Sequence, residues 1–312
     1  MRAFAIDDFG QPGSVREMPL PEPGPGEVRV RVVAAGLNPM DTFVLSGMGK
    51  GMMQYEHPII PGLDFSGVVD AVGSGVELTP GTEVFGTAMK PLWGRGAVAE
   101  FVIAPADVIV PKPANLDHVI AATLSTAGRT ALAVVDALAP RKGQTILLVG
   151  ATGGIGSFAT QLLADRGVHV IASVRPENAE YARSLGAAET IDYTAGDLAA
   201  QVRRAHPDGI DGIADFASDE ATLTRLASVV RRGGTVISPL RAANDEILVE
   251  QGIRAVNIAA APISRQSELA ELVAAGRLKA PATRTFTLDQ ASEAFGELAG
   301  RHVRGKLVIT PA

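Results

Sequence analysis

One short glycine-rich stretch constrains the fold of this chain more than any other feature. Residues 150–156 read Gly-Ala-Thr-Gly-Gly-Ile-Gly, between the apolar run TILLV and the helix-like run SFATQLLADRG. A strand that turns through glycines into a helix lets backbone N–H groups approach a pyrophosphate at the positive end of the helix. The stretch therefore predicts a dinucleotide-binding loop rather than a plain turn. Gly156 would let the helix pack close to the strand, and the expected cofactor contacts are Gly150, Thr152, Gly153, Gly154, Ile155 and Gly156.

Strand-like and helix-like segments alternate from this loop onward. We expect helices at 155–165 and 178–185 and further helices between the strands, which are predicted at 145–150, 168–174, 190–192, 211–216 and 235–238. Alternation of this kind builds a parallel sheet through right-handed crossovers. The middle of the chain is therefore predicted to be an α/β domain with a doubly wound parallel sheet.

The segments on either side of this domain have a different character. The first 110 residues contain short Val-rich runs between Gly- and Pro-rich turns, typical of an irregular barrel or sandwich, with strands expected at 28–33, 67–72, 83–85 and 99–102. Residues 116–138 predict two helices, broken near Ala127 and Gly128. After residue 260 the pattern indicates a helix at 267–275, the strand TRTFTL, a helix at 290–299 and a last strand GKLVI, and we expect this tail to return to the first domain.

Length and composition set the remaining bounds. A chain of 312 residues suits two domains, predicted here as 1–120 and 121–260, with 261–312 completing the first. The net charge of -6 and the lack of a long basic run argue against a nucleic-acid partner. Without cysteine there is neither a disulfide nor a thiolate nucleophile. No apolar run approaches the roughly 20 residues of a membrane helix, and no signal peptide is apparent, so we expect a cytoplasmic protein.

The end of the second predicted strand indicates which dinucleotide binds. A site for NAD usually carries an acid there, which holds the ribose 2′-hydroxyl. Here the strand ends in HVIASVRPEN, so Ser173 and Arg175 occupy the region and the first acid is Glu177, after a proline. The planar guanidinium of an arginine matches a phosphate, so this pattern favours NADPH. The alternative is that Arg175 is a solvated loop residue and the site does not discriminate.

An ordered series of motifs resembles the zinc-independent quinone oxidoreductases of the medium-chain dehydrogenase/reductase superfamily. It comprises GLNPMD (36–41), PIIPGLDFSGVVDAVGSGV (58–76), GAVAEFV (96–102), AATLSTAGRTAL (121–132), LLVGATGGIGSFATQL (147–162), LGAAETIDY (185–193), GGTVIS (233–238) and HVRGKLVI (302–309). The resemblance implies a β-rich GroES-like barrel domain joined to a Rossmann domain, an active site in the cleft between them, and commonly a homodimer.

The resemblance also suggests roles for single residues. Asn38 matches the Asn of the family's N-P-x-D motif, which lines the nicotinamide and substrate site, and its amide is our candidate donor to a developing oxyanion. Asp41 ends that motif, either as a substrate contact or as a carboxylate that stabilises the turn. A lysine common in the family is replaced near Asn178, which would leave Arg175 to carry the phosphate charge alone. Further expected cofactor-side positions are Tyr193, Thr130, Ser238, Gly305 and Lys306.

The same comparison predicts that no metal is bound. Zinc-dependent members of the superfamily carry a Gly-His-Glu motif and a four-cysteine lobe, whereas this chain reads Gly62-Leu63-Asp64 and lacks the lobe. Zinc needs three or four clustered ligands, and the histidines are scattered along the sequence, at positions 57, 118, 169, 206 and 302. We therefore expect all of them to be structural or surface residues.

The sequence allows two alternative roles for each of two aromatic residues, Tyr55 and Trp93. The run MGKGMMQY at 48–55 departs from the family's usual pattern; its methionines and Tyr55 could line an apolar substrate pocket or form an exposed loop. Trp93 could stand at the rim of the cleft or pack the loop down.

The expected activity is hydride transfer from NADPH to a quinone or an α,β-unsaturated carbonyl compound. Such an acceptor needs no metal to polarise it, and without a convincing general acid the final proton would come from solvent. The alternatives are a trans-acting enoyl-thioester reductase, which would need a longer acyl channel, and a non-catalytic NADPH-binding redox sensor or structural protein.

Overall fold

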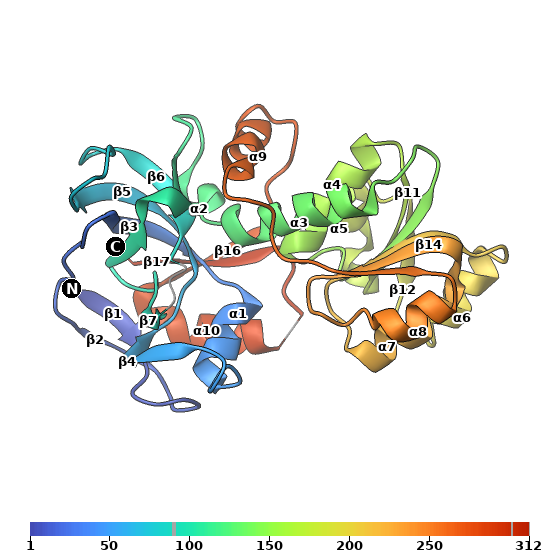
Figure 1. The fold of residues 1–312 in the computed structure, drawn as a ribbon, viewed down its shortest axis with the longest axis horizontal. Coiled ribbons are helices and arrows are strands. Elements are labelled where there is room, and N and C mark those ends of the chain that lie inside the picture. Colours follow the sequence, from blue (N-terminus) through green and yellow to red (C-terminus); the bar gives the residue numbers. More distant parts are fainter. Residues whose placement is uncertain (89–91, 301, 312) are drawn as a thin grey trace. The chain divides into compact units, whose positions relative to one another are not determined.

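The computed structural model describes residues 1–88, 92–300 and 302–311, which form two compact units (Figure 1). The first unit contains Met1–Thr126, Ile263–Arg277 and the residues from Ala282 onward. The second contains Ala127–Pro262 and the short stretch Leu278–Pro281. The sequence did not indicate that this short stretch belongs to the second unit. Within the described ranges, no helix is both long enough and apolar enough to cross a bilayer.

The second unit is built on a parallel sheet with the strand order β12-β11-β10-β13-β14-β15. The chain starts at a central strand, moves to one edge and then crosses to the other side, which is the doubly wound arrangement predicted from the sequence. The strands are β10 (Thr145–Val149), β11 (His169–Val174), β12 (Glu189–Asp192), β13 (Ile210–Asp215), β14 (Val230–Ser238) and β15 (Arg254–Asn257). Helix α3 (Ser125–Leu138) begins with the last two residues of the first unit's segment Met1–Thr126 and continues into the second unit. The other helices are α4 (Gly154–Asp165), α5 (Ala179–Ser184), α6 (Leu198–Ala205), α7 (Glu220–Leu226) and α8 (Asp245–Glu250), with 3₁₀ turns η2 (Pro176–Asn178) and η3 (Ala227–Val229).

The first unit is β-rich, as the sequence indicated. Its largest sheet has the order β16-β17-β3-β5-β6-β9, with β8 also paired to β3, while β1 pairs with β2 and β4 with β7. These strands are β1 (Arg2–Ala5), β2 (Ser14–Glu17), β3 (Glu27–Gly36), β4 (Gln54–Ile60), β5 (Asp64–Val72), β6 (Glu83–Thr87), β7 (Leu92–Arg95), β8 (Phe101–Pro105), β9 (Ile109–Pro111), β16 (Thr283–Thr287) and β17 (Lys306–Thr310). The helices are α1 (Pro39–Ser46), α2 (His118–Ala121), α9 (Arg265–Ala274) and α10 (Ala291–Ala299), with 3₁₀ turns η1 (Ala106–Val108) and η4 (Leu288–Gln290).

Strand β3 organises the core of this unit. Its side chains alternate, so that Val28, Val30 and Val32 are buried against Phe65 of β5, while the residues between them are less buried. The late strand β17 pairs antiparallel with the end of β3 (Figure 1), and its Leu307 joins the same core. This pairing confirms that the end of the described chain returns to the first unit.

The predicted break between the two helices of 116–138 is in the wrong place. Helix α2 ends at Ala121 and α3 begins at Ser125, so α3 runs through residues 127 and 128 without interruption. The cause is the carboxylate of Asp64, which accepts hydrogen bonds from the backbone N–H and the hydroxyl of Thr126 in the first turn of α3. An acid at this position stabilises the N-terminal end of a helix. Because Asp64 lies in β5, far away in the sequence, the local pattern could not locate this start.

Candidate functional site

The glycine loop joins β10 to α4 in the predicted way. Gly150 follows the strand with φ of +77°, a conformation that favours glycine, and Gly153 stands at the N-cap of α4. A Cβ atom on Gly156 would lie 2.2 Å from the carbonyl oxygen of Gly150, a distance that no side chain tolerates. This confirms that Gly156 permits the close packing of helix and loop. The backbone N–H groups at the start of α4 therefore lie beside a loop without bulky side chains, which suits a phosphate.

Two buried oxygen atoms without partners flank the end of β10. Val149 pairs with Ser173 of β11 on one side and with Asp215 of β13 on the other. Among the described residues, Ser173 Oγ and Asp215 Oδ2 are buried and have no hydrogen-bond partner, although Asp215 Oδ1 accepts from Ala217 N and Ser218 N. A buried polar group normally has a partner, so such atoms need an explanation. They lie where a doubly wound sheet binds its ligand, and a nicotinamide dinucleotide, rich in hydroxyls, fits them.

Arg175 and Tyr193, both predicted to bind the cofactor, lie next to each other. Arg175 directly follows β11 and Tyr193 directly follows β12, and the Nε of Arg175 donates a hydrogen bond of 3.0 Å to the hydroxyl of Tyr193. Tyr193 is one of the few large aromatic side chains that are well exposed. The contact fixes the orientation of the guanidinium group at the end of β11, one strand away from the glycine loop.

The remaining predicted cofactor residues are divided between the two units. Ser238 ends β14, where its buried Oγ accepts hydrogen bonds from Leu240 N and Ala242 N, and Thr130 is buried in α3. Gly305 and Lys306 instead belong to the first unit, at the start of β17. Gly305 has φ of +72°, and a Cβ atom there would lie 1.8 Å from the carbonyl oxygen of Ala282. Its glycine is thus required by the first unit itself.

Lys306 is the centre of a buried polar cluster in the first unit, which we call the Lys306 cluster: Asn38, Asp41, Asp64, Thr126 and Lys306. The Nζ of Lys306 donates to the carbonyl oxygen of Leu37 and to Oδ1 of Asn38, both at 2.6 Å. It also lies 3.7 Å from Oδ2 of Asp64. Burial lowers the pKa of Lys306, and the nearby charges of Asp64 and Asp41 oppose that shift.

Asn38 is held from several sides within this cluster. It is buried just before α1, and its Nδ2 donates to the carbonyl oxygen of Gly36 (3.2 Å) and to Oδ2 of Asp64 (3.0 Å). Its Oδ1 accepts from Lys306. Both amide hydrogens thus have acceptors inside the protein, and one of these contacts would have to open before the amide could donate to a substrate. The role of Asn38 as an oxyanion donor stays a prediction.

Asp41 stabilises the turn that carries Asn38. Its carboxylate accepts hydrogen bonds from the backbone N–H groups of Asn38 (2.7 Å) and Gly62 (3.1 Å), so it closes the N-terminal end of α1. Burial, with a contribution from the charge of Asp64, raises the pKa of Asp41 to about 7, against the influence of its hydrogen bonds and of Lys306. These contacts support the turn-stabilising interpretation.

The Lys306 cluster contains functional candidates that sequence reasoning missed. In the sequence, Asp64 stands out only as a replacement for a zinc ligand, yet it is fully buried and contacts Asn38, Thr126 and Lys306. No sequence motif points to Thr126 or Asp215 individually. The available signal was an acid, Asp64, at the start of the strand-like run DFSGVV, since ionised side chains are almost never fully buried without partners.

The segment 48–55 divides into an exposed part and a packed part. Met48 and Met52 are exposed to 57% and 80%, whereas the ring of Tyr55 packs edge-on against Phe9, with 4.9 Å between the ring centroids. Trp93 lies beside Tyr55 across the β4–β7 pair and packs on the same apolar cluster. Trp93 therefore packs this segment down. It also lines a small pocket of the first unit together with Asp41, Leu63 and Ala88.

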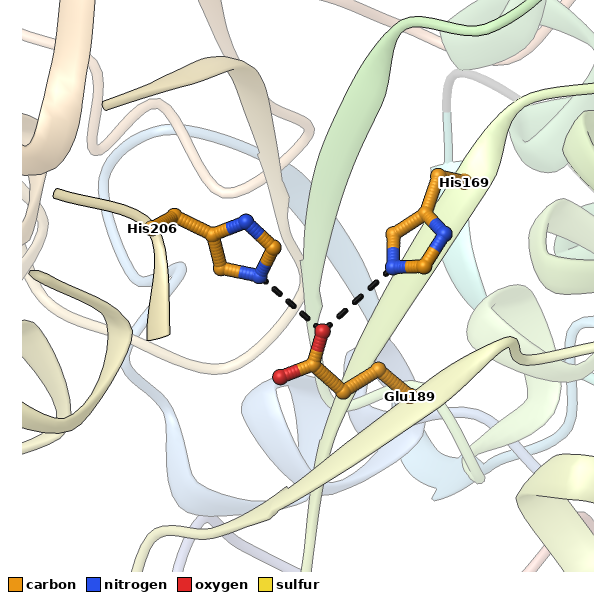
Figure 2. Close-up of side chains that lie close together, drawn as sticks. All are labelled: His169, Glu189 and His206. Carbon is orange, nitrogen blue, oxygen red and sulfur yellow. Dashed lines mark hydrogen bonds and ion pairs between the residues drawn. The ribbon is translucent and has the colours of Figure 1, made fainter. Parts of the chain in front are cut away.

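Two of the five histidines, although far apart in the sequence, lie close together in the structure. His169 and His206 both direct Nε2 at one carboxylate oxygen of Glu189, at 3.3 and 2.9 Å (Figure 2). They come from different elements of the second unit, so their separation in the sequence hid their proximity. Of the others, His118 contacts Ser66 and Glu83, and His57 contacts the backbone of Asp7.

Comparison with known sequences identifies two domain families. Residues 24–114 match the alcohol dehydrogenase GroES-like domain, and residues 185–309 match the zinc-binding dehydrogenase domain. The chain is 30% identical to the mitochondrial NAD(P)H oxidoreductase RTN4IP1 of Mus musculus, over 99% of this chain and 89% of that protein. It is 33% identical to the quinone oxidoreductase of Pseudomonas aeruginosa, over 93% of each. It is 32% identical to the 2-haloacrylate reductase of a Burkholderia species, over 95% of this chain and 94% of that protein.

A solved structure matches along the whole chain. The quinone oxidoreductase from Coxiella burnetii superposes with a TM-score of 0.91 at 29% sequence identity, and the match covers 100% of this chain and 99% of that one. The two-unit architecture is thus shared with an enzyme of known structure.

Proposed function

This chain belongs to the quinone oxidoreductase family of the medium-chain dehydrogenase/reductase superfamily, and on that premise we propose that it transfers hydride from NADPH to a quinone or an α,β-unsaturated carbonyl compound. One relative is named an NAD(P)H oxidoreductase and another a quinone oxidoreductase, and the coarser description, an oxidoreductase that uses a nicotinamide cofactor, holds for this chain. The preference for NADPH, the acceptor and the independence from zinc are the proposed parts.

The Arg175–Tyr193 contact carries the proposal of NADPH. The arginine stands at the end of β11, in the region where an NAD site holds an acid for the ribose hydroxyls. The guanidinium group is always charged and presents a planar set of donors that matches a phosphate. Because Tyr193 accepts from Nε, the group is oriented before a ligand arrives, and less entropy is lost on binding.

The second unit would hold the cofactor through the residues already described. The backbone of 150–156 would bind the pyrophosphate, Ser173 Oγ would donate to the ligand, and Arg175 would bind the 2′-phosphate. When bound, the reduced nicotinamide supplies the hydride. Ser238 would act through the backbone that it orders at the end of β14, where it accepts from Leu240 N and Ala242 N.

In the first unit, Lys306 would strengthen the amide of Asn38 as a donor. A positive charge 2.6 Å from Oδ1 polarises the amide, and a polarised amide donates more strongly through Nδ2. If the contact from Nδ2 to Gly36 opens, that hydrogen can stabilise an acceptor oxygen as negative charge develops on it. We propose that solvent then supplies the final proton.

A conjugated acceptor suits this arrangement. A quinone or an enone takes hydride at a carbon atom whose negative charge spreads onto an oxygen, and a neutral donor is enough to hold that oxygen. Two relatives carry names of this kind, a quinone oxidoreductase and a 2-haloacrylate reductase, and an acrylate is an α,β-unsaturated acid. The absence of cysteine and the Gly-Leu-Asp sequence at 62–64 support catalysis without zinc.

Two titrations and one activity panel test the proposal. We expect NADPH to bind at least roughly tenfold more tightly than NADH, because a charge-assisted phosphate contact contributes about 1.5–3 kcal/mol. We expect NADPH oxidation with ortho-quinones, para-quinones or enals, and none with saturated ketones as matched controls. Equal binding of both cofactors would refute the first part. Activity that rises with acyl chain length on enoyl thioesters would favour the enoyl reductase, and no turnover with any acceptor would favour a non-catalytic role.

The homodimer and the cytoplasmic location stay predictions. One relative is named as mitochondrial, so family membership does not fix the compartment. Light scattering of the purified protein measures the first, and fractionation of the source cells measures the second.

A further inference from the structure

A cluster of three ligand-type side chains lies in the second unit, apart from every residue assigned so far. His169 is the first residue of β11, Glu189 is the first residue of β12, and His206 directly follows α6. One nitrogen or oxygen atom from each lies within 4.8 Å of the other two. Figure 2 shows both imidazole rings directing a nitrogen at the same carboxylate oxygen.

The topology of the sheet brings these residues together. In the parallel β11–β12 pair, Glu189 stands opposite Ile171, and side chains two residues apart in a strand lie on the same face. His169 and Glu189 therefore lie on one face of the sheet. His206 lies at the carboxyl end of α6, where its backbone N–H still bonds to the carbonyl oxygen of Val202. From this position its side chain reaches Glu189. The carboxyl end of a helix carries partial negative charge, which favours a cation beside it.

We propose that His169, Glu189 and His206 bind one divalent transition-metal ion, with Zn²⁺ the best match. Two imidazole nitrogens and one carboxylate oxygen form a common zinc ligand set, with the ion about 2 Å from each atom and water in the fourth position. Copper(II) and nickel(II) also prefer imidazole and would compete. The side chains are 43%, 30% and 21% exposed for His169, Glu189 and His206, so an ion can reach them and small rotations can close the site.

The ion would connect three elements at a distance from the cofactor loop. Metal ligands lie at the amino ends of β11 and β12, whereas the glycine loop follows the carboxyl end of β10. In a parallel sheet the amino ends and the carboxyl ends of the strands lie on opposite sides of the sheet, so the ion would not take part in hydride transfer. Strand β12 is the outermost strand of its sheet, and the ion would join it to β11 and to the end of α6. Its function would be to stabilise the second unit, since a ligand that binds only the folded state raises its stability.

Calorimetric titration of the full chain with ZnCl₂ tests this proposal. The affinity tag is removed so that its histidines do not compete, and a chelator then removes any metal already bound. We expect one ion per chain and a higher melting temperature with Zn²⁺. His169→Gln, Glu189→Gln and His206→Gln should each weaken binding at least tenfold. His302→Gln, at an exposed histidine outside the cluster, is the matched control and should bind as the unmodified protein does.

Three results would overturn the proposal: no saturable binding, equal binding by the control and the cluster variants, or no change in melting temperature. Each result would mean that the two histidines only form hydrogen bonds with Glu189 and bind no metal ion. Because a cluster variant could fold poorly, the unmodified protein is also crystallised with Zn²⁺. Anomalous scattering should place the ion among the three side chains, and an ion found only elsewhere would refute the site independently of any variant.

Discussion

Lys306 Nζ and Asn38 Oδ1 lie 2.6 Å apart in the interior of the first unit, although one residue comes from the last strand of the described chain and the other from the loop after β3. The same ammonium group lies 3.7 Å from Asp64, which also contacts Asn38. A single buried cation thus joins β17, β5 and the start of α1. The predicted catalytic motif is held in place by a residue that the sequence assigned to cofactor binding.

Replacement of this cation should destabilise the protein. Lys306→Met leaves the carboxylate of Asp64 buried without its counter-charge, and breaking such a pair costs about 3–5 kcal/mol. Urea denaturation at pH 7 measures the loss. The double variant Lys306→Met/Asp64→Asn should recover part of it, because the unpaired charge is then removed. A double variant no more stable than Lys306→Met would contradict this account.

Asp41 should make stability depend on pH between about 4 and 7. Its pKa of about 7 in the folded protein exceeds the ordinary value of 3.8, so over this range the unfolded chain loses a proton that the folded chain keeps. The contribution of Asp41 to the free energy of unfolding is therefore fully present below pH 4 and falls as pH rises to 7, by on the order of 4 kcal/mol. Urea denaturation of the unmodified protein and of Asp41→Asn at several pH values gives the difference. A difference that stays constant across the range would show that this carboxyl titrates normally.

Arg175→Ala should weaken NADPH binding by roughly 10- to 100-fold and leave NADH binding nearly unchanged, because only NADPH carries the 2′-phosphate. Fluorescence titration with both cofactors measures the two dissociation constants. Arg183→Ala is the matched control, since Arg183 lies in α5 and donates to Thr190. A parallel loss of both cofactors, or a similar loss in the control, would argue against a specific phosphate contact.

Gly156→Ala should destabilise the second unit by about 1–3 kcal/mol, because the new methyl group would lie 2.2 Å from the carbonyl oxygen of Gly150 and the loop would have to move. Gly153→Ala is the control: its Cβ would lie 3.5 Å from the same oxygen, an ordinary contact, and should cost under about 1 kcal/mol. Thermal melting of both variants without cofactor separates them. Equal melting temperatures would mean that the helix does not need glycine at 156.

Asn38→Ala should lower turnover by about 100-fold or more with little change in NADPH affinity, because one oxyanion donor contributes about 10²–10³ in rate. Steady-state kinetics with a quinone and a cofactor titration provide the two measurements. Circular dichroism checks the fold, since the substitution also removes a partner of Lys306. Turnover equal to that of the unmodified protein would remove Asn38 from the mechanism.

The predictions that succeeded rest on local patterns. The strand, the glycine turn and the helix at 145–165 are neighbours in sequence, and so are the residues that form β3 and its alternating face. Contacts between distant segments were out of reach. The start of α3 depends on Asp64 from β5, and the surroundings of Asn38 depend on Lys306 from β17.

The same limit explains why the sequence did not predict the contact of two histidines with one carboxylate. His169 and His206 belong to different βα repeats, and only the register of β11 with β12 and the length of α6 bring them to one carboxylate. The sequence spacing contained no metal-ligand motif, because such motifs describe ligands on a single helix or loop.

The position of β17 imposes an order on biosynthesis. Residues 127–262 leave the ribosome before Lys306–Thr310, so the second unit can fold on the nascent chain while the first still lacks a strand. Until then Ala35 and Gly36 at the end of β3 have no neighbour from β17, and an unpaired strand edge is a template for aggregation. At roughly 5–20 residues per second, the time between the synthesis of Gly36 and that of Lys306 is on the order of tens of seconds. A stop codon just before residue 306 would therefore produce a chain with a complete second unit and a first unit whose strand edge at β3 stays unpaired, which favours binding by chaperones.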